Sequence, residues 1–468
     1  MVQSPVQPDG TVAVVGGGAG GVLVGRELLR RTSLSVQLVA ADRAPGPGVA
    51  YGAAAPWHLL NSPAGAMSAD PDDPAHFLRW SAARGRPLTA GAFVARQWYG
   101  AYLRDVFADL RGGYPGRFTV VRATVDQVCV DSPGRARLVL GDGTTLAAGR
   151  VVLAVGNAAP GIPACIGPHL YGHPAVVTDP WAPHALTRVP AGGPVLLLGT
   201  GLTAVDVALT LARGGHRGPV ILTSRHGLLP QPHRAPGAVL GRHPASACGC
   251  RPDGAQPWPP AATSLSALVR AVRAAAVRCG DWRVVVDSLR PYLDGYWQGL
   301  RTAERERWLR HLARFWEVHR HRMAPQVAEE LAELRAAGRL RVHTGGLRDL
   351  WADADSGLRG RLAGAAAEER FGAVVNCTGP GLWPAHAAPL VRTLVAAGLA
   401  RPGPYGLGLD VAPDGALLDG TGSPQRTLWT VGPARRGRLW ETTALPEIRV
   451  QARALAETFA GAPARLPA

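Results

Sequence analysis

The sequence predicts an α/β protein with two units of parallel sheet, because one three-part pattern occurs twice along the chain. Each copy consists of a short apolar strand, a tight glycine-rich turn and a helix. The first is "VAVVGGGAGGVLVGRELLRR" (residues 12–31), and the second is "LLLGTGLTAVDVALTLARGG" (residues 196–215). Such a strand–turn–helix sequence opens a doubly wound unit. Residues 237–340 interrupt the alternation of strands and helices with helical periodicity alone.

Length and composition indicate an ordinary globular protein. The chain has 468 residues, of which 47% are hydrophobic and 18% charged, and this length suits two or three domains. The longest apolar runs fall short of the roughly 18 residues that a membrane span needs. The start, "MVQSPVQPDG", lacks the pattern of a secretion signal. We therefore expect a cytoplasmic protein that does not enter a membrane.

The charge is strongly positive but carries little functional information. The net charge is +16, and because the chain has no lysine, arginine carries all of the positive charge when histidine is neutral. We interpret the charge as a solvated surface and expect no nucleic-acid partner, because neither a clustered basic face nor a binding motif is present. The absence of lysine excludes a Walker-type phosphate lysine and a Schiff-base lysine.

No metal site is expected. The stretch "HPASACGC" places His243 near Cys248 and Cys250, but a second cluster of ligands, which zinc sites usually need, is not evident. The six cysteines are too sparse for a disulfide scaffold in a chain of this length.

The first glycine turn fits the pattern G-x-G-x-x-G. It is formed by Gly16, Gly18 and Gly21 after an apolar run at 11–15. In such a turn one glycine makes the bend, one lets the backbone approach a pyrophosphate, and one lets the helix lie close to the strand. The phosphates then lie at the helix N-terminus. An acid is expected after the next strand to hold the ribose, and Asp42 is the only candidate; the alternative is a turn residue before "RAPGPG".

The second turn, formed by Gly199, Gly201 and Ala204, fits G-x-G-x-x-A. The next strand, "PVILTS", is followed by Arg225. An acid at this position selects NAD, whereas an arginine suits the 2′-phosphate of NADP. We favour the phosphate role over that of an ordinary surface arginine. Two dinucleotide sites in one chain predict FAD in one and NADPH in the other, with hydride passing from nicotinamide to flavin.

Several stretches carry a resemblance to a known family. They are "GPGVAYGAAAPWHLLNSPAGAMSADPDDPAHFLRW", "LLLGTGLTAVDVAL", "SRHGLLPQPHR", "VVNCTGP" and "LWETTALPEIRVQA". Together they resemble the bacterial FAD/NAD(P)-binding protein family, relatives of class B flavin monooxygenases and amine N-hydroxylases. The resemblance covers nearly the whole chain. A Baeyer–Villiger fingerprint, "FxGxxxHxxxW", is not visible.

The resemblance implies two Rossmann-like domains of the two-dinucleotide-binding flavoprotein type, with a helical insert. The implied boundaries are 1–160 and 371–468 for the FAD domain, 161–236 and 341–370 for the NAD(P)H domain, and 237–340 for the insert as a substrate cap. Strands ending near Gly156 and Gly379 resemble the junctions between such domains. Gly432 occupies the position of a glycine that contacts the cofactor before a long helix, although Pro433 replaces the usual aspartate.

By the same resemblance, "HLLNSPAGAMS" lies beside the isoalloxazine, which places His58, Asn61, Met67 and Ser68 near the ring. Asn61 can donate and accept hydrogen bonds, so it is a catalytic candidate, and the alternative is an Asx turn. Met67 is equally well explained by plain packing.

The second catalytic candidate, His319, lies in the insert. Trp308, Leu312, Phe315, Trp316 and His319 share one helical face, which predicts either core packing or a cap that excludes water. His319 and Arg322 could meet one anionic ligand, and Arg435 with Arg436 is a second candidate; a solvated face is the alternative.

The predicted function is that of an FAD-dependent, NADPH-using oxidoreductase, a monooxygenase that hydroxylates a small amine or amino acid through a C4a-hydroperoxyflavin. Its partners are molecular oxygen and a small substrate that contains an amine or carries negative charge. One alternative is a flavin reductase or dehydrogenase that passes electrons to a quinone or protein. Another is a non-catalytic nucleotide-binding sensor.

Overall fold

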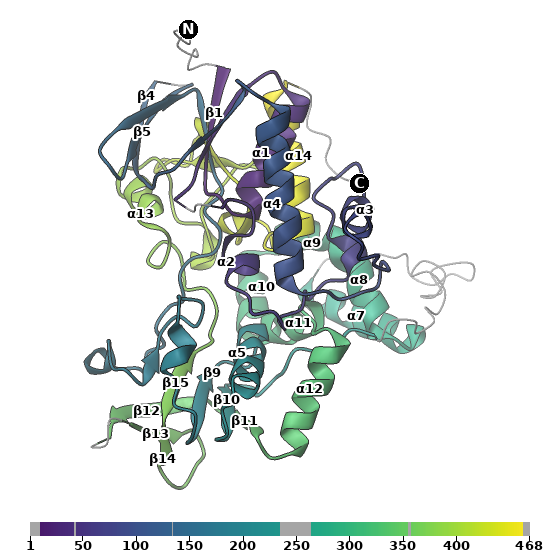
Figure 1. Ribbon diagram of the computed structural model, residues 1–468, viewed down its shortest axis with the longest axis vertical. Coiled ribbons are helices and arrows are strands. Elements are labelled where there is room, and N and C mark those ends of the chain that lie inside the picture. The colour runs from purple at the N-terminus through teal and green to yellow at the C-terminus, as the bar shows by residue number, and fades with distance from the viewer. Residues whose placement is uncertain (1–9, 42–43, 133, 235–263, 354–356, 462–468) are drawn as a thin grey trace. The chain divides into compact units, whose positions relative to one another are not determined.

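The structure, a computed structural model, describes residues 10–41, 44–132, 134–234, 264–353 and 357–461. The chain divides into two compact units (Figure 1). The first is formed by residues 1–159 together with 380–468, and the second by residues 160–379. The second unit is therefore one continuous stretch inserted into the first. It contains the helical segment as well as the second glycine turn.

The first unit is built on a six-stranded sheet in the order β16-β17-β7-β1-β2-β3. Its strands are β1 (Thr11–Val15), β2 (Ser35–Val39), β3 (Phe118–Val121), β7 (Arg150–Leu153), β16 (Ala416–Leu418) and β17 (Pro424–Thr430). All neighbours are parallel except β16 and β17. Every residue of β1 is buried, as expected of a parallel strand covered on both faces.

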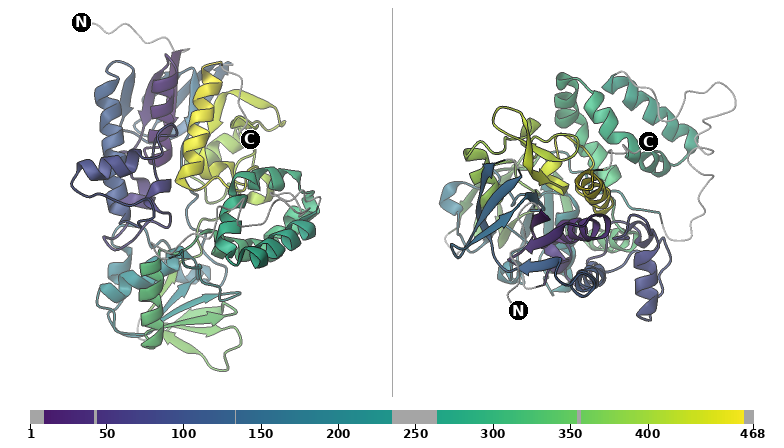
Figure 2. Two further views of the ribbon diagram at one scale, coloured as in Figure 1. Left: turned by 90° about the vertical axis from the view of Figure 1, so that its right-hand side faces the viewer. Right: turned by 90° about the horizontal axis from the view of Figure 1, so that it is seen from above.

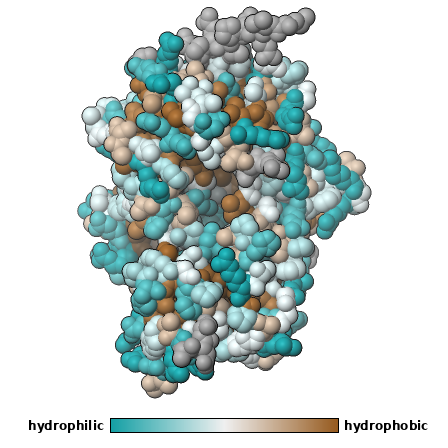
Figure 3. Space-filling model, turned by 60° about the vertical axis from the view of Figure 1, so that its left-hand side comes forward, coloured by the Kyte–Doolittle hydropathy of each residue, from teal (hydrophilic) through white to brown (hydrophobic). Residues whose placement is uncertain are grey.

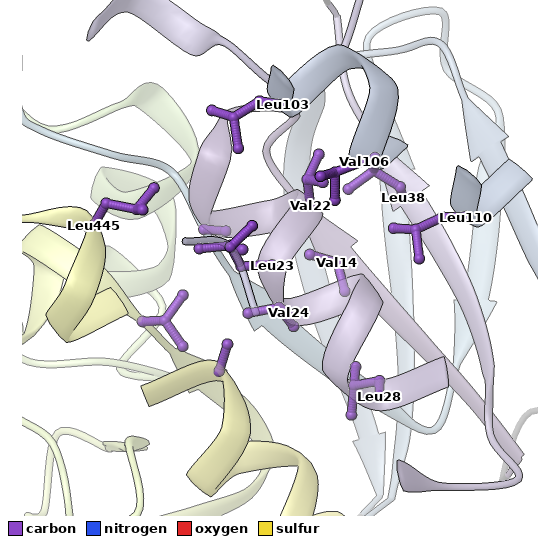
Figure 4. Close-up of a cluster of buried hydrophobic side chains, with 14 of the residues drawn as sticks. Val14, Val22, Leu23, Val24, Leu28, Leu38, Leu103, Val106, Leu110 and Leu445 are labelled. Carbon is purple, nitrogen blue, oxygen red and sulfur yellow. The ribbon is translucent and has the colours of Figure 1, made fainter. Parts of the chain in front are cut away.

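Helices cover this sheet and form its main core. The helices of the unit are α1 (Ala19–Arg31), α2 (Gly48–Gly52), α3 (His76–Ala83), α4 (Arg96–Gly113), α13 (Pro389–Ala396) and α14 (Leu445–Phe459), with the 3₁₀ turns η2 (Ala64–Ala66), η7 (Pro404–Gly406) and η8 (Gly432–Arg435). α1 packs against α14, and both views in Figure 2 show the two helices side by side. Their apolar faces meet side chains of β1, β2 and α4 (Figure 4).

A small antiparallel sheet accompanies the first unit. It consists of β4 (Val125–Ser132), β5 (Arg135–Leu140) and β6 (Thr145–Ala148), in that order. The chain leaves the unit directly after this region and returns close by. The backbone N–H of Ala159 donates to the carbonyl of His386 (2.8 Å), and the N–H of Gly381 donates to the carbonyl of Ala159 (2.9 Å). The two ends of the interruption are thus hydrogen-bonded to each other within the first unit.

The second unit contains a five-stranded, wholly parallel sheet in the order β11-β10-β9-β15-β8. Its strands are β8 (Val176–Val177), β9 (Val195–Leu198), β10 (Val220–Ser224), β11 (Leu340–Thr344) and β15 (Ala373–Asn376). The other elements around this sheet are α5 (Leu202–Arg213), α12 (Pro325–Ala336), η3 (Pro168–Leu170), η4 (Ala185–Arg188) and an antiparallel sheet of β12 (Leu347–Ala352), β13 (Leu358–Leu362) and β14 (Glu369–Phe371).

The position of β15 corrects the predicted boundary at residue 371. β15 pairs with β9 and β8 in the second unit, so the chain returns to the first unit only after Gly379. β15 lies between β9 and β8, so it occupies an interior position of this sheet. Sequence reasoning placed it in the first domain because its small residues resemble a junction, and the junction follows the strand.

The helical segment follows β10 within the second unit. It consists of α7 (Leu265–Cys279), α8 (Trp282–Leu289), η5 (Arg290–Tyr292), α9 (Leu293–Gly299), α10 (Thr302–Arg307), η6 (Trp308–Leu312) and α11 (Ala313–Arg320). Because η6 is a π-helical turn, the regular spacing of the predicted face is broken. Phe315 is 44% exposed and the other four members of the predicted face are partly buried, so the face is packed only in part.

The surface mixes polar and apolar residues. On the face shown in Figure 3, hydrophilic residues are interspersed with smaller hydrophobic areas. Among the described residues, no helix is long and apolar enough to cross a membrane.

Candidate functional site

The first glycine turn has the shape of a phosphate cradle. Gly16 follows β1 with φ +121°, and its N–H donates to the carbonyl of Val39 (2.9 Å). A Cβ at Gly16 would overlap with the carbonyl oxygen of Ala154, and one at Gly21 would overlap with the carbonyl oxygen of Gly16. Gly18 is the N-cap of α1. Only glycine therefore fits the first and third positions, and the turn leads directly into a helix N-terminus, where phosphate is stabilised.

The second turn repeats this geometry in the second unit. Gly199 follows β9 with φ +122°, and its N–H donates to the carbonyl of Thr223 (2.8 Å). A Cβ at Gly199 would overlap with the carbonyl oxygen of Cys377. Gly201 is the N-cap of α5, and Ala204 is fully buried in its first turn. The three predicted residues therefore form one turn at the carboxyl edge of the sheet.

Two residues, Arg225 and Asp42, are predicted to contact the ribose or 2′-phosphate of a bound dinucleotide. Arg225 lies directly after β10 and is exposed, as a residue that binds a ligand phosphate must be. It makes no hydrogen bond or ion pair with any described residue. Asp42 lies outside the described residues.

Two further predicted glycines occupy matching positions in the two units. Gly156 is the third residue after β7 and has φ +74°, and Gly379 is the third residue after β15 and has φ +84°. Space around both is open, since a Cβ at either position would meet nothing within 4 Å. Each therefore makes a left-handed turn where the chain crosses between the units.

The segment predicted to lie beside the flavin is fixed by buried groups. His58 is 4% exposed, and its Nδ1 accepts from the N–H of Ala55 (3.0 Å). Met67 packs in the hydrophobic core of the first unit, which favours the packing interpretation of this residue. Ser68 is fully buried, and its hydroxyl donates to the carbonyl of Asp73 (2.6 Å). Asn61 is half-buried between these anchors.

Charged side chains from two helices hold the end of this segment. Arg26 of α1 donates to Asp70 (2.5 Å), Arg30 donates to the same carboxylate (3.1 Å), and Arg449 of α14 donates to the carbonyl of Ser68 (2.6 Å). Burial opposes ionisation of Asp70, but the hydrogen bonds and charges around it outweigh burial and lower its pKa to about 2. The carboxylate is therefore ionised at neutral pH, and the segment is tied to both helices.

Gly432 is held by a closed set of buried hydrogen bonds. Its N–H donates to Gln451 Oε1 (2.8 Å), and its carbonyl accepts from the hydroxyl of Thr442 (2.8 Å). Gln451 in turn donates to the Thr442 hydroxyl (2.7 Å). Both polar backbone groups of Gly432 are thus engaged within the protein. Its φ of +75° sets the turn that leads from β17 toward the first turn of α14.

His319 and Arg322 are not neighbours on one helix, because α11 ends at Arg320. Both face Trp282, whose ring lies 4.7 Å from the His319 ring and 5.8 Å from the Arg322 guanidinium. Arg322 is buried and ion-paired with Asp287, and burial lowers its pKa. His319 Nδ1 lies 2.7 Å from the carbonyl oxygen of Phe315, so Nδ1 donates there, and in the neutral ring Nε2 is the accepting nitrogen.

Among the described residues, no group of three or more His, Cys, Asp or Glu side chains is arranged to hold a metal ion. Cys129, Cys165, Cys279 and Cys377 are free thiols. His243, Cys248 and Cys250 lie outside the described residues.

Part of the first unit matches a known protein family. Residues 13–158 match the family model described as FAD-NAD(P)-binding. This range contains the first glycine turn and the whole segment from His58 to Ser68. The chain therefore carries an FAD-NAD(P)-binding domain, as the sequence predicts, and the glycine cradle fits the phosphates of such a cofactor.

Several of the proteins to which this chain is similar are enzymes that oxygenate an amine nitrogen. Over 143 residues the chain is 34% identical to L-aspartate N-monooxygenase (nitrosuccinate-forming) from Streptomyces cremeus, a match that covers 28% of this chain and only 22% of that enzyme. The FAD-bound cadaverine monooxygenase from Erwinia amylovora gives a TM-score of 0.69 at 14% identity, covering 99% of this chain and 97% of that one. An ornithine N-hydroxylase from Kutzneria sp. 744, solved with reduced FAD, NADP⁺ and L-ornithine, gives 0.63 at 14% identity, covering 96% and 98%. The predicted two-dinucleotide-binding fold is confirmed.

Sequence reasoning missed the residues whose hydrogen bonds fix the candidate site residues in place. Thr442, Gln451, Asp70 and Arg449 were not singled out, although all four lie inside stretches that carried the family resemblance. Their signal is weak because each acts through a partner distant in sequence, such as Arg449 and Ser68. Only Thr442 and Gln451, nine residues apart beside the start of a long helix, offered a local hint.

Proposed function

We propose that the protein is an FAD-dependent, NADPH-using monooxygenase that hydroxylates the nitrogen of a small amine or amino acid. The observation that carries the proposal is the pair of matching glycine turns, one in each unit. Two such turns in one chain suit a nicotinamide cofactor that delivers hydride and a flavin that receives it. The match to L-aspartate N-monooxygenase and the shared fold with the ornithine and cadaverine enzymes favour an amine nitrogen as the oxygenated atom.

Each predicted residue then has a role in binding or orientation. In the first unit, Gly16, Gly18 and Gly21 cradle the pyrophosphate of FAD at the N-terminus of α1, and Asp42 holds its ribose. In the second unit, Gly199, Gly201 and Ala204 cradle the pyrophosphate of NADPH, and Arg225 pairs with its 2′-phosphate. When bound, FAD supplies the redox chemistry and reacts with molecular oxygen.

The remaining residues position the reacting groups. His58, Met67 and Ser68 hold the segment beside the flavin, so that Asn61 can hydrogen-bond the ring edge or the substrate. Gly156 and Gly379 shape the crossings between units, and Gly432 places the first turn of α14, whose positive end stabilises negative charge. His319, with Nε2 accepting, can take a proton from a substrate ammonium, since only an uncharged amine is nucleophilic.

Location and substrate are part of the same proposal. NADPH is a cytoplasmic reductant, so we place the enzyme in the cytoplasm of a bacterium, in line with the family resemblance. The substrate carries an amine, and a carboxylate on it would suit the many arginines of the chain.

The test is a coupled measurement of NADPH oxidation, oxygen use and product. Purified protein is loaded with FAD and offered L-aspartate, L-ornithine, L-lysine or cadaverine, and N-oxygenated product is detected by mass spectrometry. One amine should raise NADPH oxidation and yield product in proportion. Failure to bind FAD would overturn the proposal. NADPH oxidation that yields only hydrogen peroxide with every amine, together with rapid reduction of a quinone, would favour the reductase alternative.

The sensor alternative is separated by a variant of the second turn. Replacing Gly199 and Gly201 with bulky residues should abolish NADPH-dependent reduction of the flavin if the protein is an enzyme. If the protein is a sensor, the wild type itself should show no turnover with any electron acceptor.

A further inference from the structure

The helical segment is hydrogen-bonded to the chain that follows β10. The N–H of Gln231 donates to the carbonyl of Val318 (2.8 Å), and the N–H of Met323 donates back to the carbonyl of Gln231 (2.9 Å). The N–H of His233 also donates to the carbonyl of Met323 (2.8 Å). These backbone bonds set α11 in a fixed register beside the chain that leaves β10. Side chains of α11 therefore have defined positions relative to Arg225.

An exposed aromatic pair results from this register. The ring of Phe315 on α11 lies 5.7 Å from the ring of His226, centroid to centroid, with the planes tilted by 42°. His226 directly follows Arg225, and both are exposed. Phe315 is 44% exposed, which makes it one of the few large hydrophobic side chains among the described residues that face solvent. Two exposed aromatic rings thus lie beside the predicted phosphate-binding arginine, each with a face on which a flat ligand can stack.

The loop that carries Arg225 and His226 is held by hydrogen bonds to the second glycine turn. Thr200, inside the glycine turn, bonds through its hydroxyl to the Ser224 hydroxyl (2.9 Å) and donates to the carbonyl of Leu228 (2.6 Å). The N–H of Gly227 donates to the Ser224 hydroxyl (3.1 Å). The turn that holds the pyrophosphate and the loop that presents His226 are therefore one hydrogen-bonded piece.

We propose that His226 and Phe315 form the adenine subsite of the second dinucleotide site, with the base stacking on their rings while Arg225 pairs with the 2′-phosphate. The inference rests on the proposed use of NADPH. Adenine is attached to the same ribose that carries the 2′-phosphate, so it lies within one nucleoside of Arg225. A flat heterocycle gains from stacking on aromatic rings, and the stacking tolerates any dinucleotide that contains adenine. The helical segment thereby contributes to cofactor binding.

The test separates adenine stacking from phosphate recognition. Dissociation constants are measured by calorimetry on the full-length, FAD-loaded protein, with NADP⁺, NAD⁺ and adenosine 2′,5′-bisphosphate as probes. Phe315→Ala should weaken all three by about 10-fold and leave the ratio of NADP⁺ to NAD⁺ affinity unchanged. Phe315→Trp should restore binding. Arg225→Gln should instead lower that ratio.

Tyr292 provides a matched control for Phe315. Tyr292 is another exposed aromatic residue of the helical segment, 39% exposed, and Tyr292→Ala should leave all three constants unchanged. If Phe315→Ala binds every probe like the wild type while Arg225→Gln does not, the adenine subsite is overturned and the proposed function stands. If the wild type binds neither dinucleotide, the proposed function fails, and the subsite with it.

Discussion

The two glycine turns have the same backbone but different side chains around it. Gly16 and Gly199 have φ values of +121° and +122°, and each donates its N–H to the last or next-to-last residue of the neighbouring strand, Val39 or Thr223. Each also lies against a carbonyl of the strand on its other side. Steric exclusion alone therefore fixes the turn, and the turn by itself does not distinguish one dinucleotide from the other.

The differences lie at the positions that face the neighbouring strand. At the second position of the turn, a Cβ at Gly17 would press on Ala40 (2.6 Å), whereas Thr200 uses its hydroxyl to hold Ser224. Counting from the accepting strand residue places Ala41 at the position of Arg225, and Asp42 one residue later. We therefore expect the two or three side chains after the second strand to decide which cofactor each turn binds.

The largest expected effect comes from blocking either turn separately. Gly16→Val should abolish FAD retention, and Gly199→Val should leave FAD bound while slowing its reduction by NADPH roughly 100-fold, because about 3 kcal/mol of strain and overlap falls on one site only. Visible absorbance measures FAD content, and anaerobic stopped flow measures reduction. Gly91→Val, at an exposed glycine with open space around it, is the control. Loss of FAD from both turn variants would contradict the assignment of FAD to the first turn and NADPH to the second.

The next effect concerns cofactor choice. Arg225→Gln should lower the preference for NADPH over NADH about 10-fold, since one charge-assisted contact at an exposed site contributes roughly 1.4 kcal/mol. Steady-state kcat/KM with both reductants measures the preference. Arg217→Gln, which lies before β10 in the same unit, should leave it unchanged. An equal change in both variants would show that overall charge, and not position, sets the preference.

A smaller effect is expected at the buried hydrogen bonds around Gly432. Thr442→Val removes the hydroxyl shared by Gly432 and Gln451, so the free energy of unfolding should fall by about 1–3 kcal/mol in urea titrations. FAD should bind more weakly as the turn at Gly432 loosens. Thr458→Val removes a hydroxyl bonded only to its own helix and should change stability far less. Equal stability losses in the two variants would argue against the network.

The smallest effect depends on acid. The pKa of Asp70 falls from 3.8 in the unfolded chain to about 2 in the folded protein, so its contribution to stability is complete above pH 3.8 and is lost as the pH falls toward 2. Asp70→Asn should be less stable than the wild type at pH 6, and the difference should shrink below pH 3.8. Urea titrations at pH 6, 4 and 3 measure it. A constant difference at all three values would exclude this carboxylate as the source.

The comparison also shows which features a sequence can predict. The two turns were predictable because in each the glycine spacing follows an apolar strand and opens a helix. In the first turn a purely local contact also requires glycine, since a Cβ at Gly21 would overlap with the carbonyl oxygen of Gly16. Arg225 was predictable because it directly follows a strand. Local rules of this kind place a residue without knowledge of the rest of the chain.

Features that depend on distant partners were not predictable. β15 reads as a junction in the sequence, and only its pairing with β9 assigns it to the second unit. The face from Trp308 to His319 reads as regular helix, but the π-helical turn changes its spacing. The hydrogen bond between Arg449 and Ser68 joins residues 381 positions apart. Each of these results from packing between segments, which no local pattern encodes.

The hydrogen bonds that join Ala159 to His386 and Gly381 make the protein modular. The first unit meets its own ends at the point where the second is inserted, so a linker of about 2–5 residues would close it after removal of 160–379. The entropy lost in closing so short a loop is small. Asn376 donates to the carbonyl of Gly161 (3.0 Å), so the ends of the second unit also lie together. Removing or exchanging the continuous stretch 160–379 would therefore remove or exchange the whole second unit in one step.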